Sequence, residues 1–299
     1  MGTTYSIKIF DYPVNSNDIK LKIDSLLYNI NLKMSTYIPD SELSILNSKP
    51  SGSYVVSEEL LKVIDKALAY YKLDNKYDIT IKPILDKWGF GINEVQLIPD
   101  SLEIIKILDS IGSDNISIKN NKVVKLIDNI QIDLSSIAKG YAVDKVSRLL
   151  HNLSYNNFMV EIGGEIKVSG LNNNKHWTLG IVSPLDGKVL KTVAITNKSL
   201  ATSGSYNNYF TVDNIDYSHL INPLIGYPIK HSVRSVSVIA NNCIDADALA
   251  TLIMINENPY EAINIINRNE YVDAMILVVD SDDNLIEVVS NKFNNYILD

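Results

Sequence analysis

The sequence predicts an α+β protein with mixed, largely antiparallel sheets and flanking helices. Apolar residues recur at helical spacing early in the chain, most clearly over residues 16–34 and 57–73. Residues 157–240 instead alternate apolar and polar side chains between turn signals, which is typical of strands. No repeat or long linker interrupts the chain, so we expect one unit over residues 1–299, which can contain subdomains.

Local patterns predict the elements of the amino-terminal half in order. Residues 4–10 alternate like a half-buried strand, and residues 16–34 form an amphipathic helix. Ser57 is a good N-cap for a helix that runs to about residue 73. A helix over residues 101–111 is ended by Gly112. Strands over residues 117–119 and 123–127 follow, joined by a turn at Asn120 and Asn121.

The same patterns predict the second half. A strand over residues 130–133 leads into a helix over residues 135–150. The strand-rich region follows, and then two helices over residues 245–255 and 259–267, the first with Asp245 as its N-cap. The chain closes with a hairpin whose strands are residues 274–279 and 285–289.

Composition limits the classes of function. Hydrophobic residues make up 46% and charged residues 21% of the chain, which is ordinary for a globular protein. A formal net charge of -8 argues against a nucleic-acid partner, because phosphate binding needs clustered Lys and Arg. The apolar runs are far shorter than the ~20 residues of a membrane helix, and the amino end lacks a signal-peptide pattern. Cys243 is the single cysteine and is expected to be a small buried hydrophobic residue.

Residues 243–251, with the sequence CIDADALAT, carry the most informative pattern. Asp247 and Thr251 are four residues apart, so a helix places a carboxylate and a hydroxyl on one face. Such ligands suit Mg²⁺, which fills its other positions with water and phosphate oxygens. The alternative is a solvated Asp near a helix N-terminus and a Thr bonded to its own helix.

Two further segments suit an anionic nucleotide. The sequence DLSSIAKG at residues 133–140 lies at a predicted strand-to-helix turn, where backbone N–H groups and the helix dipole favour an anion. Lys139 could neutralise a diphosphate and Gly140 permits close packing, although a Lys in a first turn can simply be exposed. The sequence TSGSY at residues 202–206 is small enough for a nucleotide to lie against its backbone, and an ordinary turn is equally compatible.

These segments and several others resemble, in the same order, the ApbE family of FAD:protein FMN transferases. The resemblance covers nearly the whole chain and is carried by residues 1–5, 35–37, 41–47, 78–83, 88–91, 133–144, 163–164, 202–206, 218–223 and 247–251. Each motif alone is weak, but so many motifs in register are hard to obtain by chance.

The resemblance implies a single ApbE-like, T-fold-related domain over residues 1–299 that binds Mg²⁺ and uses FAD as substrate. By resemblance, Asp133 and Lys139 hold the FAD, and Ser136 gives its backbone carbonyl to Mg²⁺ alongside Asp247 and Thr251. The remaining FAD contacts expected are Met1, Tyr37, Asp78, Thr80, Ser203 and Gly204. Aromatic residues could flank the flavin or adenine rings, or could belong to the core; the candidates are Tyr37, Trp88 and Phe90.

His219 is the expected catalytic base, because transfer to a hydroxyl needs a group that takes the hydroxyl proton. A structural histidine at a strand end is the alternative. No role is expected for His151, His176 or His231. The chain departs from the family pattern near His219, with Asn222 in place of an Asp and Ile225 in place of a Thr, which puts the fine tuning of activity in doubt.

The function expected from the resemblance is Mg²⁺-dependent transfer of FMN from FAD to a Thr or Ser hydroxyl of an acceptor flavoprotein, with release of AMP. The alternatives are an FAD pyrophosphatase that releases FMN and AMP, and a flavin-binding protein without turnover. Family members often carry a signal or lipoprotein segment before the first motif, so we expect a location in the bacterial cell envelope, or in the cytoplasm if the chain is full length.

Overall fold

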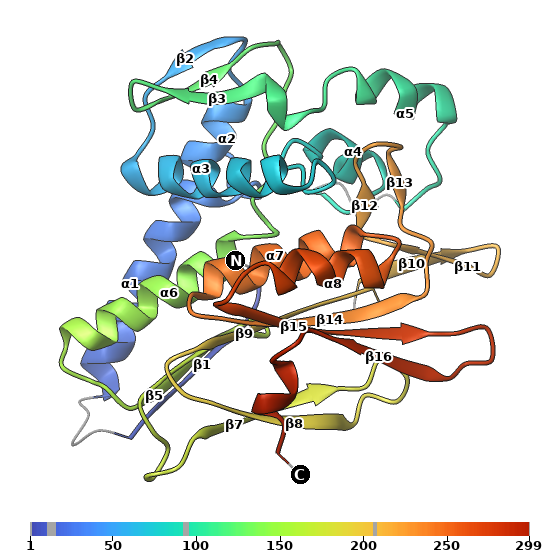
Figure 1. Cartoon of the computed structure of the whole chain (residues 1–299). Coiled ribbons are helices and arrows are strands. Elements are labelled where there is room, and N and C mark those ends of the chain that lie inside the picture. The colour runs from blue at the N-terminus through green and yellow to red at the C-terminus, as the bar shows by residue number, and fades with distance from the viewer. Residues whose placement is uncertain (1, 11–15, 92–95, 206–207, 299) are drawn as a thin grey trace. The chain divides into compact units, whose positions relative to one another are not determined.

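The computed structural model describes residues 2–10, 16–91, 96–205 and 208–298 (Figure 1). The chain forms two compact units, each assembled from separate segments. The first contains Met1–Leu27, Ile137–Gly204 and His231–Asp299, and the second contains Tyr28–Ser136 and Ser205–Lys230. Both units combine helices with strands, and every strand pair among the described residues is antiparallel. The predicted α+β class is therefore confirmed.

The first unit is built on a seven-stranded sheet in the order β1-β5-β6-β9-β14-β15-β16. Its strands are β1 (Tyr5–Ile9), β5 (Phe158–Ile162), β6 (Glu165–Ser169), β9 (Ser199–Gly204), β14 (Val233–Ala240), β15 (Val272–Val279) and β16 (Leu285–Val289). Strand β15 is buried along its whole length, as expected of a strand whose sheet is covered on both faces.

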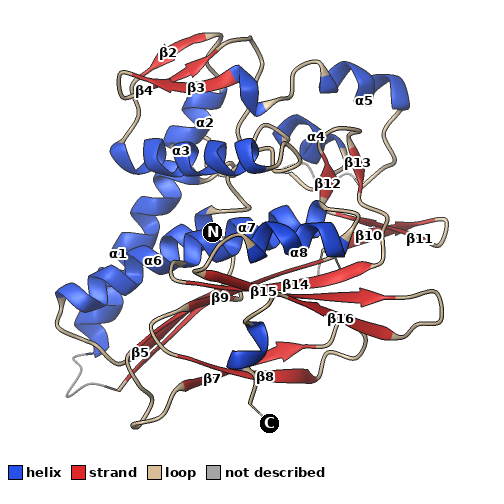
Figure 2. Ribbon diagram, in the orientation of Figure 1, coloured by secondary structure: helices blue, strands red, loops and turns tan. Residues whose placement is uncertain are grey.

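Helices cover one face of this sheet and a hairpin covers the other (Figure 2). The helices are α6 (Ala138–Asn152), α7 (Cys243–Ile255) and α8 (Pro259–Asn267), and the hairpin is β7 (Trp177–Val182) with β8 (Val189–Ile195). On the hairpin side, Trp177 packs with Met275 and with Phe293 of the 3₁₀ helix η2 (Phe293–Tyr296). Helix α7 packs against α6, β9 and β14 and buries nearly all of its side chains.

The second unit has its own sheet, β2-β4-β3, and a separate aromatic core. Trp88 is fully buried, stacks on Tyr217 at 5.4 Å between ring centroids, and donates its Nε1 proton to the Gly226 carbonyl at 2.9 Å. The helices of this unit are α2 (Glu42–Asn47), α3 (Glu58–Leu73), α4 (Lys82–Lys87), α5 (Ser101–Leu108) and η1 (Ser113–Asn115). Its strands are β2 (Gly52–Tyr54), β3 (Ile116–Lys119), β4 (Lys122–Lys125), β10 (Tyr209–Val212), β11 (Ile215–Ser218), β12 (Ile221–Asn222) and β13 (Tyr227–Pro228).

Several elements lie where the sequence predicts them. Helix α1 (Ser16–Met34), helix α8 and the closing β15–β16 hairpin are confirmed, and Ser57 caps α3 by accepting a hydrogen bond from the Leu60 N–H at 3.3 Å. The turn between β3 and β4 is also confirmed, since Asn120 and Asn121 both have left-handed φ values, 50° and 56°.

Other predicted elements are wrong. Residues 130–133 form no strand, because the Asn47 side chain bonds both the N–H and the carbonyl of Ile132 at 2.8 Å, and these groups are then not available to a β ladder. Helix α6 begins at Ala138 rather than residue 135, and α5 ends at Leu108. Residues 202–204 lie in strand β9, within the region predicted to be strand-rich, so the alternative of a turn does not apply to them.

Candidate active site

The site in the first unit is organised by a close crossing of α6 and α7. Gly140 lies in the first turn of α6, and a Cβ there would lie 2.7 Å from the carbonyl carbon of Cys243 and 2.8 Å from the Cβ of Asp247. Only glycine allows this approach. The Gly140 N–H donates to Asp247 Oδ2 at 2.8 Å, so the N-terminal turn of α6 orients the carboxylate on α7. The predicted close packing at Gly140 is confirmed.

Asp144, one turn further along α6, fixes the start of α7. Its carboxylate accepts hydrogen bonds from the N–H groups of Cys243 at 3.0 Å and Ile244 at 2.9 Å. The residue before α7 is Asn242, whose side chain does not cap the helix. Asp144, which lies on α6, accepts the hydrogen bonds of an N-cap instead. Asp245 therefore is not the N-cap that the sequence predicts; it lies inside the first turn.

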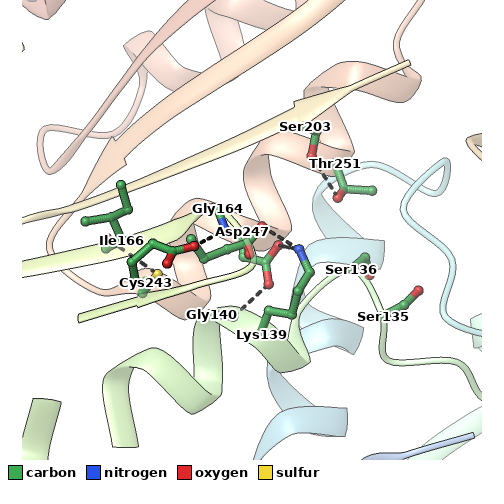
Figure 3. Close-up of polar contacts among 12 residues, drawn as sticks. Ser135, Ser136, Lys139, Gly140, Gly164, Ile166, Ser203, Cys243, Asp247 and Thr251 are labelled. Carbon is green, nitrogen blue, oxygen red and sulfur yellow. Dashed lines mark hydrogen bonds and ion pairs between the residues drawn. The ribbon is translucent and has the colours of Figure 1, made fainter. Parts of the chain in front are cut away.

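Asp247 is a buried carboxylate with one side turned towards a positive charge. Its side chain is 4% exposed, and its Oδ1 lies 4.0 Å from the Lys139 ammonium (Figure 3). Burial raises the pKa of Asp247, while Lys139 and the Gly140 N–H oppose the rise. A carboxylate in this position favours a nearby cation, because burial without one penalises its charge.

Lys139 is held between two carboxylates. Its ammonium forms an ion pair with Glu165, the first residue of β6, and also faces Asp247. Burial alone would lower the pKa of Lys139, but the charges of Asp247 and Glu165 outweigh burial and the net shift is upward. Burial, and then the charge of Asp247, raises the pKa of Glu165, while the charge of Lys139 and its hydrogen bond oppose the rise. The cluster thus has two acidic groups for one ammonium.

Thr251 and Ser203 complete this side of the site. Thr251 follows Asp247 by one turn of α7, and its hydroxyl lies 3.3 Å from the Ser203 hydroxyl on β9 (Figure 3). Two predicted site residues, Thr251 for the metal and Ser203 for FAD, are thereby brought together. Gly204 is the next residue of β9 and is buried opposite Ser235.

The oxygen donors of this unit suit a hard cation such as Mg²⁺. Among the described residues no group of three or more His, Cys, Asp or Glu side chains could hold a metal, which argues against a zinc-type or all-carboxylate cage. Mg²⁺ binds through one or two carboxylates and keeps its other positions for water and phosphate oxygens. The Asp247 carboxylate and Thr251 hydroxyl, one helical turn apart, meet that requirement.

In the second unit, Asp133 and Ser136 lie in the segment that leads to α6. Asp133 Oδ1 accepts from the Ser135 N–H at 2.8 Å and from its hydroxyl, and the Ser136 hydroxyl lies 2.9 Å from the Tyr77 hydroxyl. The Ser136 side chain is therefore engaged with a tyrosine. A backbone carbonyl as metal ligand stays a prediction, as does a contact of Asp133 with FAD.

Asp78 and Thr80 use their side chains internally. Asp78 Oδ1 accepts from the Thr80 N–H at 2.7 Å, the Thr80 hydroxyl at 2.6 Å and the Ser113 hydroxyl at 2.7 Å. Thr80 accepts in turn from the Gly112 N–H at 2.8 Å, and both side chains are buried. Any contact of this segment with a ligand would then come from its backbone rather than from these side chains.

His219 follows strand β11, the strand-end position that the sequence predicts. Its Nδ1 lies 2.9 Å from the Asn208 carbonyl, which can only accept, so Nδ1 carries the proton and the basic lone pair is on Nε2. The Phe90 ring lies 6.3 Å from the imidazole. Asn222 Oδ1 accepts from the Leu224 N–H at 3.0 Å, a turn contact that an Asp would make equally well.

The remaining predicted residues are in different surroundings. Tyr37 is 63% exposed, whereas Trp88 is fully buried in the aromatic core and forms no ligand wall. Met1 and Tyr206 lie outside the described residues. Cys243 is buried, as predicted, with its thiol 3.7 Å from the Ile166 carbonyl.

Glu165 and Asp144 fix the positions of Lys139 and of the start of α7, and the sequence analysis assigned a role to neither of them. A usable signal lies in strand β6, where Glu165 and Lys167 are two residues apart and so point to the same face. That face meets α6: Glu165 pairs with Lys139, and Lys167 lies 3.1 Å from Asp144. Two charges on one face of a central strand indicate buried partners, although not which ones.

Comparison with known proteins identifies the family of the chain. The model of the ApbE family matches residues 1–276. An FAD:protein FMN transferase from Vibrio cholerae is 36% identical over 305 residues, covering 99% of this chain and 90% of that protein. Another from Haemophilus influenzae is 33% identical, covering 98% of this chain and 88% of that protein.

Solved structures lead to the same family. The flavin transferase ApbE from Vibrio cholerae has a TM-score of 0.92 at 34% identity, covering 99% of this chain and 96% of that chain. The ApbE protein from Thermotoga maritima has a TM-score of 0.89 at 28% identity, covering 100% of this chain and 97% of that chain. The chain belongs to the ApbE family.

Proposed function

We propose that this protein transfers FMN from FAD to a Thr or Ser hydroxyl of an acceptor flavoprotein. Membership of a family whose relatives carry the name FAD:protein FMN transferase supports the reaction class. The observation that carries the proposal for this chain is the cluster of Asp247, Lys139 and Thr251, which suits a cation and a diphosphate.

The proposed reaction exchanges one phosphate ester bond for another. The acceptor oxygen attacks the phosphorus of the FMN half of FAD, the bond to the bridging oxygen breaks, and AMP leaves with that oxygen. The hydroxyl proton passes to Nε2 of His219, because Nδ1 already donates to the Asn208 carbonyl. Lys139 would hold the diphosphate by its charge.

Mg²⁺ is the proposed cofactor, held by Asp247 and Thr251, with the Ser136 carbonyl as the third protein ligand expected from the sequence. When bound there, it would supply positive charge to the diphosphate and so favour the leaving of AMP. The proposed FAD contacts remain those predicted from the sequence, with the backbone of residues 78–80 in place of the Asp78 and Thr80 side chains.

The test is to incubate the protein with FAD and MgCl₂, with or without a flavoprotein fragment that bears an acceptor Thr, and to measure AMP and the acceptor mass. An acceptor heavier by one FMN, with equimolar AMP, supports transfer. Free FMN with AMP would instead identify a pyrophosphatase, and intact bound FAD a binding protein.

Two pairs of variants assign the residues. Asp247→Asn should abolish Mg²⁺-dependent turnover, whereas Asp245→Asn, which removes a charge from the same helix, should retain most of it. His219→Ala should lower kcat about 10²–10⁴-fold with FAD affinity retained, while His176→Ala, at an exposed site, should change little. Equal loss of FAD binding and kcat in His219→Ala would contradict the assignment of the base.

We further propose that residues 1–299 act as one flavin transferase domain, which the continuous family match across both units supports. None of the described helices is long and apolar enough to cross a membrane. The proposed compartment is the bacterial cell envelope, as expected from the family resemblance. Recovery of the native protein in the cytosolic fraction of lysed cells would contradict this location.

A further inference from the structure

Lys139 faces two carboxylates but contacts them unequally. Its ammonium forms a direct ion pair with Glu165 Oε1, whereas Asp247 Oδ1 lies 4.0 Å away. Asp247 has its other oxygen, Oδ2, bonded to the Gly140 N–H. The structure therefore leaves Oδ1 facing the ammonium without a direct hydrogen bond from it.

This geometry matters because an ammonium and a divalent cation compete for the same carboxylate. If Lys139 closed on Asp247, a cation would have to displace a buried ion pair, and breaking a buried pair is costly. Glu165 offers the ammonium a second partner in the same buried region, since Glu165 is 2% exposed and its Oε1 is already within contact.

We propose that Glu165 is a positioning residue that holds the Lys139 ammonium away from Asp247 and so keeps Asp247 open to a divalent cation. This inference rests on the proposed function only in placing the cation at Asp247. Glu165 would also balance charge when the cation is present, because Lys139 and the cation would otherwise repel each other across Asp247.

The placement of Glu165 supports a dedicated role. Glu165 follows the two-residue turn of Gly163 and Gly164, whose φ values of 60° and 98° are the left-handed conformations that such a tight hairpin needs. This turn sets Glu165 directly opposite Ile162 and aims its carboxylate at α6. The second oxygen, Oε2, is buried and has no hydrogen-bond partner among the described residues. Glu165 therefore pays the desolvation cost of a buried carboxylate, and its Oε1 uses the charge to bind the Lys139 ammonium.

The experiment is a calorimetric titration of the whole protein with MgCl₂ in the absence of FAD, so that catalysis plays no part. Glu165→Gln keeps the shape of the side chain but removes its charge, and we expect it to weaken Mg²⁺ binding about tenfold. Glu161→Gln is the matched control, since Glu161 is a carboxylate of the neighbouring strand β5 that accepts from the Gly164 N–H, and it should match the wild type.

The decisive arm removes the competing ammonium. Lys139→Met alone should bind Mg²⁺ at least as tightly as the wild type, because it removes a positive charge 4.0 Å from Asp247 Oδ1. Adding Glu165→Gln to Lys139→Met should then have less than about a twofold effect, since no ammonium remains to close on Asp247. A merely structural role of Glu165 would weaken binding equally in both backgrounds.

Each result has a defined meaning. Unchanged binding in Glu165→Gln, an equal loss in the double variant, or a tenfold loss in Lys139→Met would overturn the proposal. If Glu165→Gln does not fold by circular dichroism, Glu165→Asp withdraws the carboxylate while keeping its charge and should weaken binding by a smaller factor; unchanged binding there would also overturn it. A wild-type protein that binds no Mg²⁺ would instead defeat the proposed metal site itself.

Discussion

Replacing Gly140 with alanine tests whether the crossing of α6 and α7 positions the Asp247 carboxylate. The new Cβ would lie 2.7 Å from the Cys243 carbonyl carbon and 2.8 Å from the Asp247 Cβ. An ordinary contact begins at 3.4 Å, and the atom of Cys243 belongs to the backbone, so no side chain can swing away. The two helices would have to separate by at least about 0.7 Å.

Three contributions set the change in the free energy of unfolding of Gly140→Ala. Overpacking costs about 1–3 kcal/mol. The Gly140 N–H to Asp247 bond would stretch from 2.8 Å to about 3.5 Å, and loss of a buried bond to a charged group costs about 1.5–3 kcal/mol. The better helix propensity of alanine returns about 1 kcal/mol. We therefore expect Gly140→Ala to lower the free energy of unfolding by about 1.5–5 kcal/mol and to weaken Mg²⁺ binding.

The assay is urea unfolding followed by circular dichroism, together with Mg²⁺ titration of the folded variant. Gly180→Ala is the control, because its Cβ would meet only the Val189 side chain, at 3.1 Å, among its nearest neighbours. That variant should lie within about 1 kcal/mol of the wild type. If Gly140→Ala instead stabilises the protein by about 1 kcal/mol, as helix propensity alone requires, and binds Mg²⁺ normally, the reasoning is refuted.

Three other substitutions test single contacts. Asp144→Ala removes the acceptor of two N–H groups at the start of α7. Urea unfolding should show a loss of about 1–3 kcal/mol in the free energy of unfolding. An unchanged midpoint of the urea transition would exclude the capping role. Lys125→Met should lower the free energy of unfolding by about 1–3 kcal/mol in the same assay. The buried Lys125 ammonium donates hydrogen bonds to the carbonyls of Leu46, Asn47 and Lys49 at the end of α2. An unchanged free energy would mean that water replaces the ammonium as the donor. Burial lowers the pKa of His231 below 6.5, so the unfolded chain takes up its proton first and stability is lost as pH falls below about 6.5. His231→Asn should flatten the fall of Tm between about pH 6.5 and 5, and parallel slopes for variant and wild type would contradict this.

The helices were predicted best where a single segment decides the outcome. Helix α1, the capped start of α3 and helix α8 follow from periodicity and capping residues that lie within a few positions of each other. The strand predicted over residues 130–133 failed for the opposite reason. Its sequence suits a strand, but the Asn47 side chain, from a distant helix, takes the hydrogen bonds of Ile132.

The site residues also divide into those that local spacing predicts and those that only tertiary neighbours decide. Asp247 and Thr251 could be paired from the sequence because four residues span one helical turn, and the structure places both on α7. Trp88 was a candidate ligand wall from its aromatic character, but it is enclosed by Tyr217 and Phe210 in the core. Whether an aromatic side chain faces a ligand or the core depends on neighbours that no local pattern names.

The sequence by itself determined the family, the fold class and the residues that share one helical face, because these depend on local spacing and on motifs in a given order. Only the tertiary structure decided that Glu165 pairs with Lys139, that Asp144 caps α7, and that Gly140 lies against Asp247. These pairs join residues far apart in the chain, and burial, which makes their charges matter, arises only when the segments have packed.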